Sequence, residues 1–273
     1  MKVGYYQFRP LFGKVEKNLN KIINAIGRAD VDTDLIVLPE LALTGYYFKD
    51  RNQLKSLAED PANSSRIDSL IKLCKKNDLH LVMGFAELAG SKVYNSSILI
   101  GPNGTEHIYR KLHLFNEEKN IFDQGDIPLS IQSVKGVKIG MMVCFDWVFP
   151  EVMRSLTLLG AEIICHPSNL VLAFCQEAMV TRCLENRVFA VTSNRYGVDK
   201  RPQGKIKFTG KSQIIAPGGR LINRAASQRE QLFIADIDHT DAQNKSITPF
   251  NDLLSDRRPD CYDALLISDR IQE

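Results

Sequence analysis

Two short apolar segments, each ended by a proline, most constrain how this 273-residue chain can fold. Residues 35–38 read Leu-Ile-Val-Leu, and such a continuous apolar run is typical of a strand that is covered on both faces. Pro39 ends the run, because proline cannot donate a hydrogen bond to a strand ladder, so Glu40 lies just past a strand end. Residues 161–168 repeat this pattern. Strands buried on both faces predict an α/β protein in which helices cover the sheets.

The rest of the chain continues this mixed pattern. Further strands are expected at residues 2–7, 80–87, 93–100, 106–111, 137–143, 189–194, 211–216, 221–224 and 231–237, and helices at residues 15–26, 66–76, 150–159 and 174–188. Strands outnumber helices by more than a simple alternation of parallel strands and helices would give. No Gly/Ser-rich linker or change in composition separates two domains, so we expect a single layered α/β domain.

Composition excludes several classes of protein. The 35 basic and 32 acidic residues leave a net charge of only +3 and are scattered, which argues against binding to nucleic acid. No apolar run approaches the roughly 20 residues of a membrane helix, and the N-terminus lacks the apolar stretch of a secretory signal. We therefore expect a cytoplasmic protein whose partner is a small-molecule substrate, without binding to a membrane.

Cysteine and histidine spacing excludes two further kinds of site. Six cysteines without a CxxC pair or a signal peptide indicate reduced thiols rather than a disulfide framework. Cys165 and His166 are neighbours on an expected strand and would point to opposite faces. We expect neither a bound metal nor a cofactor, because no ligand spacing typical of a metal site occurs.

Three polar residues, Glu40, Lys111 and Cys144, follow expected strands directly or end them. Ligands bind at strand ends in open α/β sheets. Taken singly, each residue has a structural explanation: a helix cap, a surface lysine and a small buried apolar side chain, respectively. Together they could activate a nucleophile, since a cysteine thiol needs a nearby base or cation to react at neutral pH.

The sequence around all three residues resembles the nitrilase superfamily of carbon–nitrogen hydrolases. The matching segments are Leu-Pro-Glu at 38–40, Tyr-Arg-Lys-Leu-His at 109–113 and Cys-Phe-Asp at 144–146, in the order and spacing of the compact members. The resemblance covers residues 2–237. It implies a four-layer αββα sandwich in a domain at residues 1–245, with a C-terminal extension at 246–273 that is used in dimer contacts. A homodimer or a larger homo-oligomer is implied.

The resemblance also assigns roles. Glu40 would take the thiol proton, Lys111 and the backbone N–H of Phe145 would stabilise the developing oxyanion, and Cys144 would carry a thioester. A second glutamate often supports the lysine in this family. Glu117 and Glu118 are both candidates, and we favour Glu118.

The residues after the nucleophile bear on the substrate. Asp146 follows Cys144 by two positions, as in the amidases and carbamoylases of the family, whereas typical nitrilases carry Trp-Glu directly after the cysteine. We expect a small linear amide or N-carbamoyl substrate that releases ammonia, with an aliphatic nitrile as the alternative. The expected pocket lining is Tyr47, Phe122, Trp147, Asn169 and Leu170, for which ordinary core packing is the alternative. Arg182 could bind a substrate carboxylate or pair with Glu185.

Two other classes of function stay open on the sequence. A thiol enzyme could use a Cys–His pair, with His113 or His166 as the base. A non-enzymatic scaffold or binding subunit could also keep the fold without the activity.

Overall fold

Two six-stranded sheets form the centre of the molecule. The computed structural model describes residues 1–28 and 32–267. The first sheet has the order β14-β1-β2-β3-β4-β5, and the second has the order β13-β12-β9-β8-β7-β6. The bounds in the first sheet are β1 Lys2–Gln7, β2 Leu35–Val37, β3 His80–Ala89, β4 Lys92–Gly101, β5 Gly104–Arg110 and β14 Gln231–Asp236. Those in the second are β6 Ile131–Val134, β7 Val137–Met141, β8 Ile163–Ser168, β9 Phe189–Asn194, β12 Gln213–Ile215 and β13 Leu221–Arg224.

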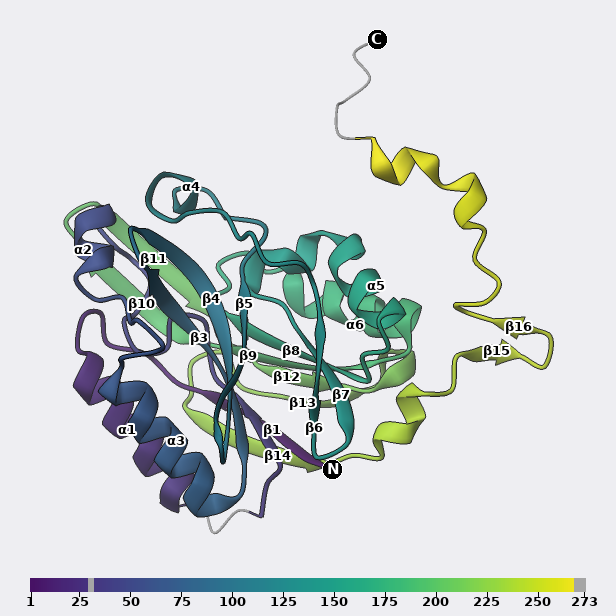
Figure 1. Cartoon of the computed structure of the whole chain (residues 1–273), viewed down its shortest axis with the longest axis horizontal. Coiled ribbons are helices and arrows are strands. Elements are labelled where there is room, and N and C mark those ends of the chain that lie inside the picture. The colour runs from purple at the N-terminus through teal and green to yellow at the C-terminus, as the bar shows by residue number, and fades with distance from the viewer. Residues whose placement is uncertain (29–31, 268–273) are drawn as a thin grey trace.

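Helices cover the outer face of each sheet (Figure 1). Helices α1 (Val15–Arg28) and α3 (Ser65–Asn77) lie on the first sheet, and α5 (Pro150–Leu158) and α6 (Cys175–Asn186) lie on the second. The inner faces of the sheets pack on each other, with β1, β2 and β3 against β8 and β9. These four layers confirm the expected αββα sandwich.

Each outer layer forms because amphipathic helices pack their apolar side against the apolar face of a sheet. Ile22 of α1 and Leu70 of α3 are fully buried and share one core with Ile36 of β2. Ser64 caps the N-terminus of α3, because its side chain accepts a hydrogen bond from the backbone N–H of Ile67. The apolar residues of these helices recur every three or four positions, which explains why their periodicity predicts them well.

Strand directions bring several chain segments to a common edge. Strands β1, β2 and β3 are parallel, and so are β7, β8 and β9. Strand β4 is antiparallel to both β3 and β5, so β5 runs in the same direction as β2. The residues that follow β2 and β5 therefore lie at one edge of the first sheet, and those that follow β7 and β8 lie at one edge of the second.

Some elements differ from the sequence expectation. The expected strand at residues 137–143 ends at Met141, because Val143 already donates its backbone N–H to the side chain of Asp146 in the next turn. The expected helix at residues 174–188 ends at Asn186, where Arg187 adopts a left-handed backbone with φ of 46°.

Several short elements were not expected. They are the hairpin of β10 (Tyr196–Arg201) and β11 (Gly204–Thr209), the helices α2 (Arg51–Lys55) and α4 (Glu118–Ile121), the strand β6, and the strands β15 (Ser246–Thr248) and β16 (Asn251–Asp252). Short 3-10 turns occur at Cys144–Val148, Pro217–Gly219, His239–Ala242, Pro259–Cys261 and Asp263–Leu266.

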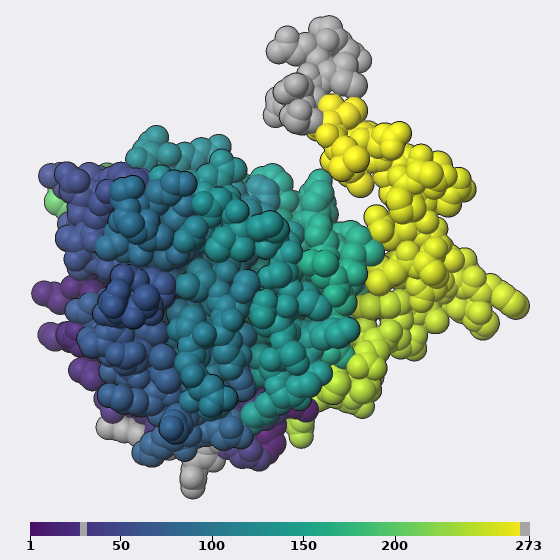
Figure 2. Space-filling view, in the orientation of Figure 1, coloured from purple at the N-terminus to yellow at the C-terminus, as the bar shows by residue number. Residues whose placement is uncertain are grey.

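The C-terminal segment, residues 246–267, projects away from the rest of the chain (Figures 1 and 2). It carries exposed apolar side chains, of which Phe250 is 94% and Leu266 is 87% exposed. The prediction that residues 246–273 form dimer contacts is not tested by a single chain, and its last part, residues 268–273, lies outside the described residues. Across residues 1–28 and 32–267, no helix has the length and apolar character needed to cross a membrane.

Candidate active site

Glu40, Lys111 and Glu118 form one buried cluster at the edge of the first sheet. Nζ of Lys111 donates a hydrogen bond to Oε1 of Glu40 at 2.8 Å. It also donates to both carboxylate oxygens of Glu118, at 3.0 and 2.8 Å. All three side chains are buried. Lys111 follows β5, and Glu40 follows Pro39 just beyond the end of β2. Because β2 and β5 run in the same direction, these two residues meet although they are 71 residues apart in the sequence.

The charges in this cluster stabilise the ammonium form of Lys111. Burial alone would lower the pKa of Lys111, but the carboxylates of Glu118 and Glu40 raise it well above its ordinary value. Burial raises the pKa of Glu118, an effect that Lys111 partly opposes. Lys111 therefore remains a cation at neutral pH and can stabilise negative charge beside it.

A glycine allows Glu40 to sit at this position. A Cβ on Gly84 of β3 would lie 2.4 Å from Cα of Glu40, so a larger residue would push the Glu40 backbone away. Gly84 also holds the turn, since its carbonyl accepts from the backbone N–H of Ala42 and its N–H donates to the carbonyl of Pro39. The position of Glu40 thus depends on β3 as well as β2.

Cys144 begins a 3-10 turn that follows β7 of the second sheet after Met142 and Val143. Its φ is 43°, a left-handed conformation that costs energy for a residue with a Cβ. Burial raises the pKa of the Cys144 thiol well above its usual value; the charge of Glu40 adds to this effect and Lys111 opposes it. The thiol is therefore protonated at rest and must lose its proton to a base before it can attack.

Glu40 has one carboxylate oxygen free to be that base. Oε1 accepts hydrogen bonds from Lys111 and, at 2.7 Å, from the side-chain amide of Asn95. Oε2 is buried and has no hydrogen-bond partner among the described residues. A buried oxygen without a partner is costly, and such exceptions often mark a functional role.

Asp146 connects the segment around Lys111, residues 109–113, to the 3-10 turn that begins at Cys144. Its Oδ2 accepts from the backbone N–H of Val143 at 2.9 Å and from the hydroxyl of Tyr109 at 2.8 Å. Its Oδ1 accepts from the backbone N–H of His113 and lies 2.8 Å from Nδ1 of that residue. The sequence indicated Asp146 only as a marker of substrate class. Its anchoring role was missed, because nothing in the local pattern shows that the segment at residues 109–113 meets the turn that contains Asp146.

The two histidines do not support a Cys–His pair. His113 binds Asp146 and stacks on Phe149, with ring centroids 3.6 Å apart. Nε2 of His166 lies 2.9 Å from the backbone carbonyl oxygen of Cys144. Burial lowers the pKa of His166 to about 4. Neither histidine has the sulfur of Cys144 among its hydrogen-bond partners in the described part of the chain.

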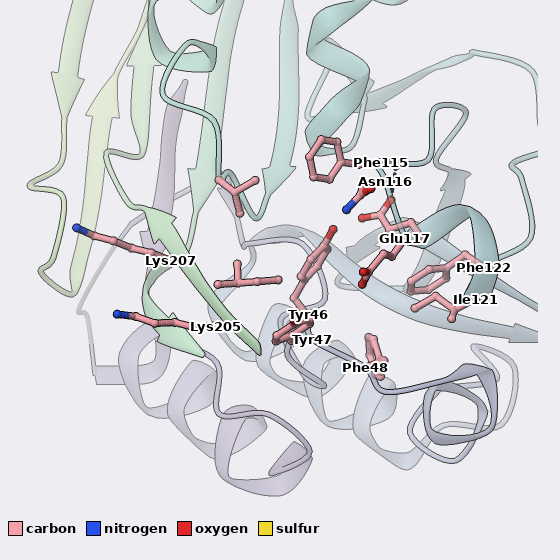
Figure 3. A pocket seen from close by; sticks show the side chains of 13 residues that line it. Tyr46, Tyr47, Phe48, Phe115, Asn116, Glu117, Ile121, Phe122, Lys205 and Lys207 are labelled. Atoms are coloured by element: carbon pink, nitrogen blue, oxygen red, sulfur yellow. Dashed lines mark hydrogen bonds between the residues drawn. The ribbon is translucent and has the colours of Figure 1, made fainter. Parts of the chain in front are cut away.

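Two adjoining hollows open beside the cluster. The smaller, of about 20 Å³, is lined by Cys144, Phe115, Phe145, Trp147, Asn169, Leu170, Val171 and Leu172. The larger, of about 360 Å³, is lined by Tyr46, Tyr47, Phe48, Phe115, Asn116, Glu117, Glu118, Ile121, Phe122, Val171, Lys205, Ile206 and Lys207 (Figure 3). Phe115 and Val171 line both. The hairpin of β10 and β11, which the sequence analysis missed, supplies one wall of the larger hollow.

The predicted lining residues thus divide between the two hollows. Trp147, Asn169 and Leu170 lie at the smaller one beside Cys144, as does Phe145, and Tyr47 and Phe122 lie at the larger one. The side-chain amide of Asn169 also donates to the backbone carbonyl of Glu40 at 2.9 Å, which ties the edges of the two sheets together.

Arg182 lines neither hollow and pairs with Glu185 at 3.0 Å, the second of the two interpretations above. Within the ranges 1–28 and 32–267, no group of three or more His, Cys, Asp or Glu side chains is arranged to hold a metal ion.

Comparison with known proteins identifies the family. The family model of carbon–nitrogen hydrolases matches residues 2–245. The chain belongs to the carbon–nitrogen hydrolase family. It is 37% identical over 263 residues to a nitrilase from Pyrococcus abyssi, covering 96% of this chain and 99% of the relative. It is 32% identical to an (R)-stereoselective amidase from Pseudomonas sp, covering 94% and 92%.

Among solved structures, a carbon–nitrogen hydrolase from Helicobacter pylori G27 superposes with a TM-score of 0.89 at 25% identity, covering 98% of this chain and 99% of that one. The protein is therefore a hydrolase of carbon–nitrogen bonds in the nitrilase superfamily, and the scaffold alternative is not supported.

Proposed function

We propose that this carbon–nitrogen hydrolase cleaves a small linear amide or N-carbamoyl compound through a thioester on Cys144 and releases ammonia. The observation that carries the proposal is the unpartnered Oε2 of Glu40 within a buried cluster that also holds Lys111. Such an oxygen provides a general base where the thiol needs one.

In the first half-reaction, Glu40 takes the proton from the Cys144 thiol as the sulfur attacks the amide carbonyl carbon. The carbonyl oxygen becomes an oxyanion, which Lys111 and the backbone N–H of Phe145 stabilise. Phe145 is the second residue of the 3-10 turn, where a backbone N–H has no partner within the helix. Glu40 then returns its proton to the leaving nitrogen, the C–N bond breaks, and ammonia departs.

In the second half-reaction, water hydrolyses the thioester. Glu40 takes a proton from the water as its oxygen attacks the carbonyl carbon, and a second oxyanion forms beside Lys111. The C–S bond breaks, the sulfur regains a proton from Glu40, and the acid is released. In total, one amide and one water give one acid and one ammonia. Glu40 and Cys144 end in the protonation states in which they began.

An aliphatic nitrile is the second candidate substrate, favoured by the identity to a protein named nitrilase. The same sulfur would add to the nitrile carbon, and two waters would be consumed for each ammonia released. Asp146, two residues after the nucleophile, instead favours amides and carbamoyl compounds within the family.

A panel of short amides, N-carbamoyl compounds and nitriles tests the proposal by ammonia release and by the intact mass of the protein. We expect ammonia from amides or carbamoyl compounds and, on rapid quenching, an acyl mass increase on Cys144 that Cys144→Ala abolishes. Turnover of nitriles alone would favour the second candidate. Turnover without any dependence on Cys144 would overturn the proposed mechanism.

We further propose that the protein acts in the cytoplasm as a homodimer or larger homo-oligomer, with residues 246–273 in the contact. The exposed Phe250 and Leu266 support this assembly, since large apolar side chains on a projecting segment favour burial against a partner.

A further inference from the structure

His166 is a buried histidine that the proposed mechanism does not use. It lies on β8, is fully buried and lines neither hollow. Its Nε2 is 2.9 Å from the backbone carbonyl oxygen of Cys144, and its Nδ1 is 3.1 Å from the hydroxyl of Thr192 on β9. Burying a polar ring is costly unless its nitrogens find partners, and here one of those partners is the backbone of the proposed nucleophile.

The partners of His166 determine which ring nitrogen carries the hydrogen. A carbonyl oxygen can only accept, so Nε2 carries the hydrogen and donates it to Cys144. Nδ1 then accepts from the hydroxyl of Thr192. Oγ of Ser168 lies 3.0 Å from Nε2 and is a second acceptor for the same hydrogen. Burial lowers the pKa of His166 to about 4, so the ring is neutral at pH 7. His166 is thus a fixed hydrogen-bond donor.

The carbonyl that His166 binds belongs to the same peptide group as the backbone N–H of Phe145. This group is planar and trans, so its carbonyl and its N–H point in opposite directions. A donor that fixes the carbonyl therefore also fixes the direction of the N–H. Phe145 lines the smaller hollow with Cys144, and its N–H donates to no acceptor among the described residues. This N–H is the one proposed above to stabilise the oxyanion.

The backbone of Cys144 needs such support. Its φ of 43° is unfavourable for a residue with a Cβ, and a relaxed turn would rotate the peptide group that follows Cys144. Asp146 holds the turn on the preceding side, through the backbone N–H of Val143. His166 holds it on the following side, through the carbonyl of Cys144. A hydrogen bond to the carbonyl also polarises the peptide group, which strengthens its N–H as a donor.

Resting on the function proposed above, we infer that His166 is a positioning residue of the oxyanion site. It holds and polarises the peptide group between Cys144 and Phe145 from within the core, so that the N–H of Phe145 meets the oxyanion that forms beside Lys111. His166 itself does not touch the substrate. Its loss should therefore weaken transition-state stabilisation and leave substrate binding and the thiol unchanged.

Replacing His166 by Leu tests this inference, because leucine fills much of the same space without a donor. We expect kcat for butanamide to fall roughly 10- to 100-fold, with KM within about twofold of the wild type. The loss should be smaller than for a deleted oxyanion donor, because the N–H of Phe145 remains but is no longer held. His166→Gln can place an amide N–H near the position of Nε2 and should regain most of the activity.

Two probes of the Cys144 thiol separate the oxyanion site from the nucleophile. Butanal adds reversibly to the thiol: a C–S bond forms, and the carbonyl oxygen takes the thiol proton while it occupies the oxyanion position. Its inhibition constant should rise by about the same factor as kcat falls. Iodoacetamide alkylates the sulfur by displacing iodide and forms no oxyanion. Its rate at Cys144, followed by peptide mass, should stay within about twofold of the wild type.

Thr157→Val is the matched control for the loss of a buried hydrogen bond. The hydroxyl of Thr157 donates to the carbonyl of Met153 within α5, and Thr157 lines neither hollow. This variant should lose stability and keep the wild-type kcat. Circular dichroism and thermal unfolding show which variants fold. If His166→Leu does not fold, Thr192→Val loosens the ring without removing it and should show the same pattern, with kcat reduced about threefold.

The possible failures are distinguishable. Wild-type kcat in folded His166→Leu, or an unchanged inhibition constant of butanal while kcat falls, would overturn the inference. Alkylation that slows as much as kcat would also overturn it, because His166 would then position the sulfur. Each of these results leaves the proposed function intact. Amide hydrolysis that does not depend on Cys144 would instead overturn the proposed function, whereas both probes report on the thiol whatever the substrate.

Discussion

Glu118 binds the ammonium group of Lys111 through both of its carboxylate oxygens, at 3.0 and 2.8 Å. One of these oxygens also accepts the backbone N–H of Phe115, at 2.9 Å. Lys111 is therefore oriented by a carboxylate other than the proposed base. Glu40 contributes only Oε1 to the lysine, which leaves Oε2 without a partner among the described residues and open to the proposed proton transfer.

Replacing Glu118 by Gln should lower kcat by roughly 10²-fold, because a neutral amide holds the ammonium group of Lys111 less firmly where the oxyanion forms. Thermal unfolding measured in parallel should show a folded but less stable protein, since a buried ion pair has lost one partner. Glu151→Gln is the surface control and should match the wild type in both measurements. Unchanged turnover in Glu118→Gln would remove Glu118 from the mechanism.

Cys144→Ala should abolish ammonia release, with kcat reduced by at least about 10⁴-fold, since the covalent step is lost. The variant should fold, because alanine removes one sulfur and keeps the Cβ. Circular dichroism and unfolding curves check the fold, and ammonia release checks the activity. Residual turnover within tenfold of the wild type would mean that another group performs the attack.

The pH dependence of stability follows from raised pKa values. The folded protein keeps the Cys144 thiol protonated above its unfolded pKa of about 9.0, so stability falls as the pH rises past that value. Lys111 acts in the same direction above its unfolded value of 10.5, because its stabilising charge is lost on deprotonation. We expect Tm to fall between pH 9 and 11, and less steeply in Cys144→Ala. Identical slopes for the two proteins would contradict the raised pKa of Cys144.

Asp146→Asn should lower both activity and stability. The carboxylate accepts three hydrogen bonds from Val143, Tyr109 and the backbone of His113, and Asn offers only one accepting oxygen. We expect a loss of roughly 2–3 kcal/mol in the free energy of unfolding. Turnover should also fall roughly tenfold or more, since small errors in the position of a nucleophile are costly. Chemical denaturation and kcat measure the two effects. Wild-type values for both would show that the Cys144 turn holds without this anchor.

Introducing charge on the C-terminal segment should weaken self-association. Phe250→Asp combined with Leu266→Asp places carboxylates on two highly exposed positions, so the fold should keep its stability. Light scattering at several protein concentrations should show a smaller species or weaker association than in the wild type. An unchanged oligomer would mean that this segment lies outside the contact.

The elements differ in how well the sequence predicts them. Strands β1, β9 and β13 begin and end at the expected residues. The β10–β11 hairpin was missed. Its strand sequences contain Lys and Arg at exposed or half-buried positions, include the buried Asp199, and lack a clear apolar alternation.

The proposed site residues Glu40, Lys111 and Cys144 were predicted from local motifs at strand ends. Glu40 and Lys111 meet within the first sheet, whereas Cys144 follows a strand of the second, so its position relative to them depends on how the two sheets pack. The preference for Glu118 over Glu117 agrees with its contact to Lys111, but the spacing alone could not decide it. The larger hollow was only partly foreseen, because its wall at Ile206 comes from the unpredicted hairpin.

The proposed base and nucleophile belong to different sheets: Glu40 follows β2 in the first, and Cys144 follows β7 in the second. In a chain with only one sheet formed, the thiol of Cys144 would lack its proposed base, and Glu40 would have no thiol to deprotonate. The proposed chemistry therefore requires both sheets to be packed on each other.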